Sequence, residues 1–330
     1  NSGVDSISVL QEMAKVSASG FTAFLAAASS TLFELNHWGE IKPYLNNDKT
    51  FDQPNYRRWK SLITAQETQF VTLIAPRIRV RPEYQHSHWK RTNPFFDEII
   101  ESNSDILWGN PAYRYASSVI RAFHQSGWFL NIRSPLPAKT CYQRAYHKLD
   151  NHKRSSKQIT ECHVTHAIES LFNDAGITTV KDHPISEILT FYRQISLYQP
   201  ASTIDKALNQ TYFVNTQLPY ILCAARFSQA LKVMLRDKIG GFSSAEECEQ
   251  WLQNWILQYC ASSGAPGNNL QSKYPLESAN ISIKPQPNKP GVFQCTAQIK
   301  PHSIMNSIDA SLKLISHIKS NNIIGEQAHA

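Results

Sequence analysis

The sequence predicts a mixed α/β (α+β) fold: a mixed sheet with covering helices, then a C-terminal helical pair and a small sheet. In residues 1–199 helical and strand patterns alternate, as in a sheet covered by helices. Residues 218–255 repeat apolar side chains with a period near 3.6, and residues 279–318 contain strand patterns. Because a single core stops growing at about 250–300 residues, this chain of 330 residues is expected to form two domains, 1–199 and 200–330.

Capping residues and hydrophobic periods place the elements of the first domain. Asn110 and Pro111 are an N-cap and first-turn pair, Gly127 stops the helix that follows, and Pro54 suits another first turn. Helices are therefore expected at Ile7–Val16, around Leu32, at Pro54–Ile63, from Asn110 to Gly127 and at Ala167–Asp174. Strands are expected at Phe21–Ala28, Phe70–Ala75, Trp128–Ile132, Ile159–Val164 and Ile177–Val180.

The segment Leu218–Trp255 predicts two amphipathic helices joined at Gly240-Gly241. The second helix begins at Ser243 or Ser244, each with a Glu three residues later as in a capping box, and it places Trp251 and Trp255 in the core. In the first helix the polar face is formed by Gln229, Lys232 and Arg236. The apolar face is formed by Tyr220, Cys223, Ala224, Phe227, Ala230, Leu231, Met234 and Leu235.

The C-terminal region predicts a small antiparallel sheet. Strand patterns at Ala279–Lys284 and Val292–Lys300 flank the proline-rich turn Pro285–Gly291, and a third strand is expected at Ile308–Ile318. The glycine- and asparagine-containing stretch Ser262–Ser272 is expected to be an exposed loop. Three strands form a small sheet, which is marginal unless another element covers or extends it.

Composition argues against membrane insertion and nucleic-acid binding. The longest apolar run, Phe21–Ala28, is much shorter than the roughly 20 residues that span a bilayer, so the chain is expected to be soluble. The formal net charge of +7 is spread over both halves. Arg77, Arg79 and Arg81 alternate with apolar residues, which is typical of the solvated face of an edge strand rather than of a nucleic-acid surface.

No catalytic or metal-binding pattern is present in the sequence. Six cysteines are scattered without CxxC spacing, which indicates reduced thiols in a cytoplasm. Cys162, His163 and His166 form the one metal-like cluster, but neighbours on a strand point to opposite faces, which favours a packed cysteine beside surface histidines. Phosphate-binding and nucleophile-elbow motifs are absent, so neither enzyme activity nor a cofactor is expected. The alternative is a cytoplasmic α/β enzyme whose site carries no recognisable motif.

Several sequence blocks are similar to the large subunit of the bacterial type VI secretion contractile sheath, the TssC/VipB family. The similar blocks are LPYILCAARFSQALKVMLRDKIGG from Leu218, Phe51 to Leu62, Phe70 to Arg77, Trp108 to Ala116 and Gly127 to Pro135. The resemblance extends from about Leu10 to about Lys319. Two departures, the nearly uncharged Ile63–Glu67 and the basic, histidine-rich Lys139–Lys157, indicate an IglB-like branch. Because the chain begins at Asn1 without methionine, the family's N-terminal region is expected to be missing from it.

The resemblance implies a contractile-sheath fold, with 1–199 as the sheath middle domain and 200–330 as the inner C-terminal domain. It implies a heterodimer with a small sheath subunit of the TssB/VipA/IglA type, further copies of the chain in a helical tube, and an Hcp-like inner tube, in the bacterial cytoplasm. A disassembly ATPase would act through the missing N-terminal region.

The resemblance also implies two sets of contact residues. Strand addition from other subunits is expected at Val292, Gln294, Thr296, Ile308, Ala310, Leu312 and Leu314, and a proline at Leu312 is expected to abolish assembly. Contact with the inner tube or a neighbouring subunit is expected at Gln229, Lys232, Arg236 and Lys238.

Overall fold

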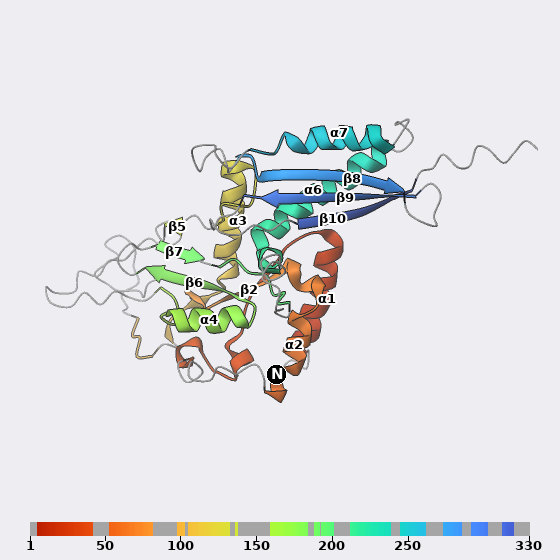
Figure 1. The fold of residues 1–330 in the computed structure, drawn as a ribbon. Coiled ribbons are helices and arrows are strands. Elements are labelled where there is room, and N and C mark those ends of the chain that lie inside the picture. Colours follow the sequence, from red (N-terminus) through yellow and green to blue (C-terminus); the bar gives the residue numbers. More distant parts are fainter. Residues whose placement is uncertain are drawn as a thin grey trace, which may run out of the picture. The chain divides into compact units, whose positions relative to one another are not determined.

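The computed structural model contains two compact units, which are described separately (Figure 1). The first comprises residues 1–18, 23–120 and 133–199, and the second comprises residues 19–22, 121–132 and 200–330. Within them the structure describes residues 5–41, 53–81, 98–102, 105–132, 136–137, 159–183, 188–191, 193–200, 212–238, 245–261, 273–285, 292–302 and 312–319.

A mixed sheet with the strand order β1-β2-β6-β7-β5 forms the centre of the first unit. Strands β1, β2 and β6 run parallel, whereas β7 is antiparallel to both β6 and β5. A separate ribbon pairs β3 with β4. The strands are β1 Phe24–Ala27, β2 Val71–Ala75, β3 Ile78–Arg79, β4 Trp108–Gly109, β5 Leu136–Pro137, β6 Ile177–His183 and β7 Ile188–Phe191.

Helices pack on this sheet around a continuous apolar core. The rings of Phe33, Trp38 and Phe172 meet in edge-to-face and tilted arrangements, and all three side chains are fully buried. The helices and 3-10 turns are α1 Ser6–Gly20, η1 Ser30–Phe33, η2 Trp38–Glu40, η5 Pro54–Tyr56, α2 Arg57–Ile63, η6 Gln66–Phe70, α3 Ala112–Ser126 and α4 His166–Asp174. The last residues of α1 and of α3 belong to the second unit.

The turn between α4 and β6 requires a glycine. Gly176 has a φ of +75°, and a Cβ at this position would lie 2.8 Å from the Leu197 carbonyl oxygen. Gly127 also has a φ of +75° and ends α3, with its N–H donating to the Phe123 carbonyl, as the sequence predicted. These two glycines fix where the helices end.

Several strand predictions for the first half were wrong in detail. Trp128–Ile132 forms turns, and its alternating apolar residues are buried without a paired strand. Ile159–Val164 makes a single antiparallel bridge, between Thr160 and Ile78, rather than a strand. The strand expected at Phe21–Ala28 is limited to β1, because Phe21 adopts a left-handed conformation with a φ of 51°. Strand β7 was not predicted.

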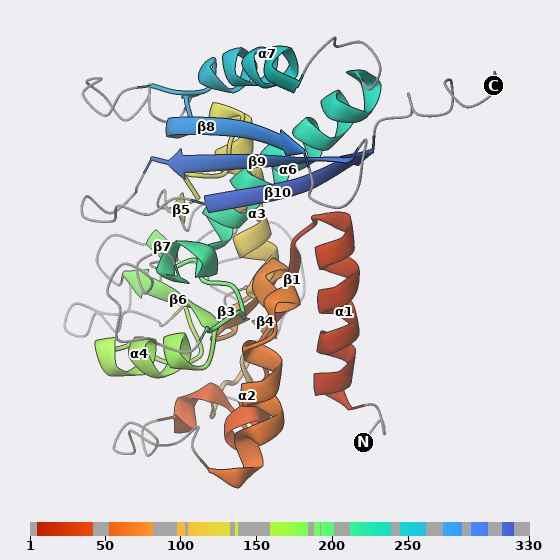
Figure 2. The ribbon, with the colours of Figure 1, turned by 45° about the vertical axis from the view of Figure 1, so that its right-hand side comes forward.

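The second unit is a three-stranded antiparallel sheet with helices α6 and α7 (Figures 1 and 2). Strand β9 lies in the centre, between β8 and β10. Helix α6 covers one face of the sheet, and α7 runs along β8. The elements are α6 Leu218–Lys238, α7 Ala245–Leu257, β8 Leu276–Pro285, β9 Val292–Pro301 and β10 Leu312–Lys319.

The predicted helical pair and sheet are present, which confirms the mixed α/β class. Phe227 and Leu231 of α6 and Leu252 and Ile256 of α7 are buried in one core with the inner side chains of the sheet. Several predicted features lie outside the described residues: Gly240-Gly241, the capping serines Ser243 and Ser244, the loop Ser262–Ser272, most of the turn before β9, and the start of the third strand including Ile308 and Ala310.

Candidate assembly surface

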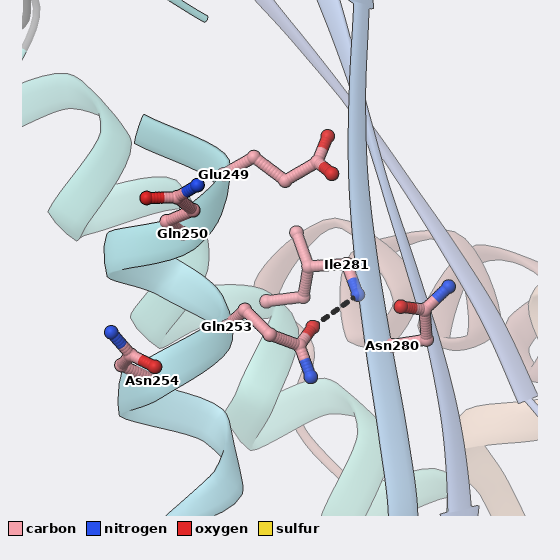
Figure 3. Close-up of a pocket in the computed structure, with 6 residues that line it drawn as sticks. All are labelled: Glu249, Gln250, Gln253, Asn254, Asn280 and Ile281. Atoms are coloured by element: carbon pink, nitrogen blue, oxygen red, sulfur yellow. Dashed lines mark hydrogen bonds between the residues drawn. The ribbon is translucent and has the colours of Figure 1, made fainter. Parts of the chain in front are cut away.

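Side chains of α7 cover the outer edge of β8. The Ile281 N–H donates to the Gln253 Oε1 atom over 2.8 Å, and the Ile283 N–H donates to the Glu249 Oε2 atom over 2.7 Å. In return, the Gln253 Nε2 atom donates to the Ala279 carbonyl over 2.9 Å. Figure 3 shows Gln253 and Glu249 reaching from the helix towards the strand. Backbone groups at this edge are therefore already hydrogen-bonded within the chain.

The beginning of β8 is covered by backbone instead. Leu276 donates its N–H to the Tyr259 carbonyl over 3.2 Å and accepts a hydrogen bond from the Ala261 N–H over 3.0 Å. These bonds form an isolated parallel bridge between Cys260 and Leu276. The segment after α7 thus continues the coverage that Gln253 and Glu249 provide further along the strand.

A hollow of about 310 Å³ lies between α7 and β8 and is lined by Glu249, Gln250, Gln253, Asn254, Asn280 and Ile281 (Figure 3). Its volume is at the lower limit for small-molecule sites, which are mainly apolar clefts with a few placed polar groups. Here the lining is mostly amide and carboxylate, and Gln253 and Glu249 already bond the strand. The hollow is therefore explained by the covered strand edge.

The register shows which backbone groups of β10 face outwards. Ile281, whose N–H bonds α7, is opposite Ala297, so the Ala297 backbone must face β10. Ala297 is in turn opposite Leu314, which makes these two residues a hydrogen-bonded pair. Alternation along the strand then directs the backbone groups of Lys313, Ile315, His317 and Lys319 away from β9. Among the described residues no strand pairs with β10 on that side.

The residues expected to accept an added strand lie in different environments. Val292, Gln294 and Thr296 are on the central strand β9, whose two edges pair with β8 and β10. Leu312 and Leu314 are on β10, with their backbone groups directed at β9. Within the described residues, the edge of the sheet opposite β8 is therefore formed by β10 and not by β9.

The polar face of α6 is exposed, as the sequence predicted, but part of it makes contacts within the second unit. The Gln229 amide donates to the Gly20 carbonyl over 3.3 Å, and the Lys232 ammonium lies 4.2 Å from the centre of the Phe21 ring. Arg236 pairs with Asp237 on the same exposed turn. The Lys238 side chain lies outside the described part of the structure.

The three arginines of the first unit are not simply solvated. Arg77 makes two hydrogen bonds of 2.6 Å to the buried Glu161 carboxylate, and this partner raises the pKa of the Arg77 guanidinium. Arg81 pairs with Glu98 in the same two-bond manner. Burial lowers the pKa of Arg79, whose Nε atom donates to the Arg81 carbonyl. The prediction of a solvated strand face was wrong. Arg77 and Arg81 pair with carboxylates that lie 84 and 17 residues away, which a local alternation of residues does not reveal.

Cys162, His163 and His166 do not converge. The Cys162 side chain is buried, whereas His163 is exposed and the His166 side chain is 97% exposed. In the described part of the chain no three histidine, cysteine or acidic side chains are close enough together to hold a metal ion. The described cysteines are all free thiols.

Sequence reasoning missed Glu249 and Gln253 as residues of this surface. They are four residues apart, and they share the face of α7 that also carries the core residues Leu252 and Ile256. Polar residues beside an apolar stripe are the available signal, since they lie where the helix meets its neighbour.

Within the described residues, no helix combines the length and apolar character that crossing a membrane requires.

Comparison with known proteins shows similarity along nearly the whole chain. Residues 1–198 match the family described as EvpB/VC_A0108, tail sheath N-terminal domain, and residues 207–318 match EvpB/VC_A0108, tail sheath gpW/gp25-like domain. The type VI secretion system sheath protein TssC1 of Pseudomonas aeruginosa is 28% identical over 331 residues. That similarity covers 95% of this chain but 64% of TssC1, so the chain spans less than two thirds of its relative's length.

Proposed function

Because the chain belongs to the VipB/TssC family of type VI secretion tail-sheath large subunits, a family of structural proteins rather than enzymes, we propose that it builds a contractile sheath. The observation that supports this most directly is that two sheath domain models match in order, over residues 1–198 and 207–318. The IglB-like branch stays a prediction, which these matches do not test.

The proposed partners follow from the family. The chain pairs with a small sheath subunit of the TssB/VipA/IglA type and polymerises with further copies of itself around an Hcp-like inner tube in the bacterial cytoplasm. Subunits assembled in an extended lattice relax to a shorter, wider one and drive the tube through the envelope. Interfaces that do not close on themselves generate such a helix. A disassembly ATPase acts on the assembled protein through a region outside this chain.

The two domains have different proposed roles. Residues 1–199 form the middle domain, and residues 200–330 form the inner domain, whose sheet holds neighbouring subunits together. A strand from another subunit adds to the outward edge of β10, where alternate backbone groups face away from β9. Hydrogen bonds between backbone groups are suited to this role because they depend little on the side chains of the two joined subunits.

The polar face of α6 is the proposed contact with the inner tube or a neighbouring subunit. Arg236 is the residue to test first, since Gln229 and Lys232 already contact Gly20 and Phe21 within the second unit. Arg236 lies on an exposed turn next to Asp237, and an acidic partner surface can displace that weak pairing. Lys238 belongs to the same proposed contact.

Co-expression with the small sheath subunit tests this function. We expect the two chains to copurify and to form long tubes in negative-stain images, with extended and contracted forms of different length. The chain expressed without the small subunit is expected to form no tubes. A chain that stays monomeric and does not bind the small subunit would contradict the proposal.

A further inference from the structure

The spacing of Glu249 and Gln253 on α7 matches the spacing of the backbone groups they bind on β8. Four residues of an α-helix rise about 6 Å, and two residues of an antiparallel strand rise about 6.8 Å. Going along α7, Glu249 bonds Ile283 and Gln253 then bonds Ile281 and Ala279, so the helix and the strand run in opposite directions. The helix thus presents polar groups at nearly the repeat of a paired strand.

Gln253 imitates one residue of such a strand. Its side-chain amide accepts a hydrogen bond from the Ile281 N–H and donates one to the Ala279 carbonyl. A neighbouring strand would make the same pair of bonds with its own C=O and N–H groups. Glu249 supplies a further acceptor for the Ile283 N–H, and Tyr259–Ala261 bonds Leu276 at the start of the strand.

We propose that Glu249 and Gln253 close the β8 edge against strand addition, so that an extended segment of a neighbouring sheath subunit can add to this sheet only at β10. Exposed strand edges tend to pair with other chains, and proteins block those edges where pairing is not wanted. A strand that approached β8 would have to displace both side chains and the hydrogen bonds they make. The closure itself is independent of the proposed function, whereas the choice of β10 rests on it.

Hydrogen exchange on the full chain, expressed without a partner, tests the closure. In the double variant Glu249→Leu/Gln253→Leu the side-chain bulk is kept and the acceptors are lost. We expect the amides of Ile281 and Ile283 to exchange at least about tenfold faster than in the parent chain, because each loses its hydrogen bond. The Glu249→Gln variant keeps an acceptor oxygen and should retain the protection of Ile283.

The matched control is Gln250→Leu/Asn254→Leu. Gln250 and Asn254 line the same hollow but are exposed on α7, and their side chains do not reach towards β8 as those of Glu249 and Gln253 do (Figure 3). In this control the amides of Ile281 and Ile283 should exchange at the same rate as in the parent chain. Unchanged exchange in Glu249→Leu/Gln253→Leu, or equal acceleration in the control, would overturn the closure. If the leucine variant does not fold, loss of protection in the Glu249→Gln variant would count against it equally.

Self-association shows whether the closure guards the edge. In sedimentation velocity the opened variant, Glu249→Leu/Gln253→Leu, should associate more strongly with increasing concentration than the parent and the control do. The reason is that an uncovered β8 edge can pair with a second copy of the chain. An opened variant that associates no more than the parent would refute the guarding role. Neither result depends on tube formation, so failure of the sheath proposal can be distinguished from failure of this one.

Discussion

At the scale of single residues, the buried Glu161 carboxylate joins parts of the first unit that are distant in sequence. It accepts hydrogen bonds from the Arg77 guanidinium and from the backbone N–H of Trp38, 84 and 123 residues away. The Trp38 ring belongs to the aromatic core with Phe33 and Phe172. A carboxylate buried to this degree is tolerated because both of its oxygens accept hydrogen bonds and its partner is a guanidinium. The sequence offered no sign of this pairing, since the partners share no local pattern.

Buried thiols predict how stability changes at alkaline pH. Burial raises the pKa of Cys223 to about 12, whereas a thiol in the unfolded chain titrates near its ordinary value of 9.0. Above about pH 9 the unfolded chain releases a proton that the folded chain retains, so the free energy of unfolding should fall as the pH rises from 9 towards 12.

Replacing Cys223 with Ala should reduce that slope by up to about 1.4 kcal/mol per pH unit. Urea unfolding at pH 8, 9 and 10 measures it. Since Cys248 is half-buried, Cys248→Ala is the control and should change the slope less. Equal slopes in the Cys223→Ala variant and the parent chain would contradict the prediction.

At the scale of elements, α6 depends on its aromatic contacts. Phe227 is 1% exposed, and its ring centre lies 5.0 Å from that of Trp128, 5.5 Å from that of Tyr259 and 6.1 Å from that of Trp255. Phe227→Ala should lower the free energy of unfolding of the second unit by about 3–5 kcal/mol, because the cavity is surrounded by rigid rings. Denaturant unfolding followed by tryptophan fluorescence measures this.

The control for Phe227→Ala is Val233→Ala on the same helix. Val233 is 46% exposed, and its truncation should change the free energy of unfolding by less than about 0.5 kcal/mol. Since alanine has a higher helix propensity than either residue, similar losses in both variants would contradict the role of the aromatic cluster.

Local patterns predicted the helices better than the strands. The buried stripe of α6 follows from a 3.6-residue period, which depends only on neighbours in sequence. The alternation at Trp128–Ile132 was misleading because a strand also needs a partner, and no paired strand is present there among the described residues. The roles of Glu249 and Gln253 depend on β8, about thirty residues further along the chain. Strand addition to this sheet stays a prediction, and the register was needed to tell which residues of β10 direct their backbone groups away from β9.

At the scale of the whole molecule, assembly is proposed to depend on one edge of a three-stranded sheet. A proline at Leu312 is a poor test of that proposal, because the Leu312 backbone faces β9 and the change would weaken the chain's own ladder. The backbone of His317 faces outwards. A proline there removes a donor from the free edge while the bonds between β9 and β10 remain, as prolines on natural edge strands do.

His317→Pro should therefore abolish tubes on co-expression with the small subunit, while the free energy of unfolding of the isolated chain stays within about 1 kcal/mol of the parent. His317→Ala is the control; it keeps the backbone N–H and should still form tubes. Negative-stain microscopy and urea unfolding measure the two effects. Tubes of parental length and yield from His317→Pro would exclude β10 as the acceptor edge. Loss of tubes in His317→Ala as well would assign the contact to the imidazole rather than to the backbone ladder.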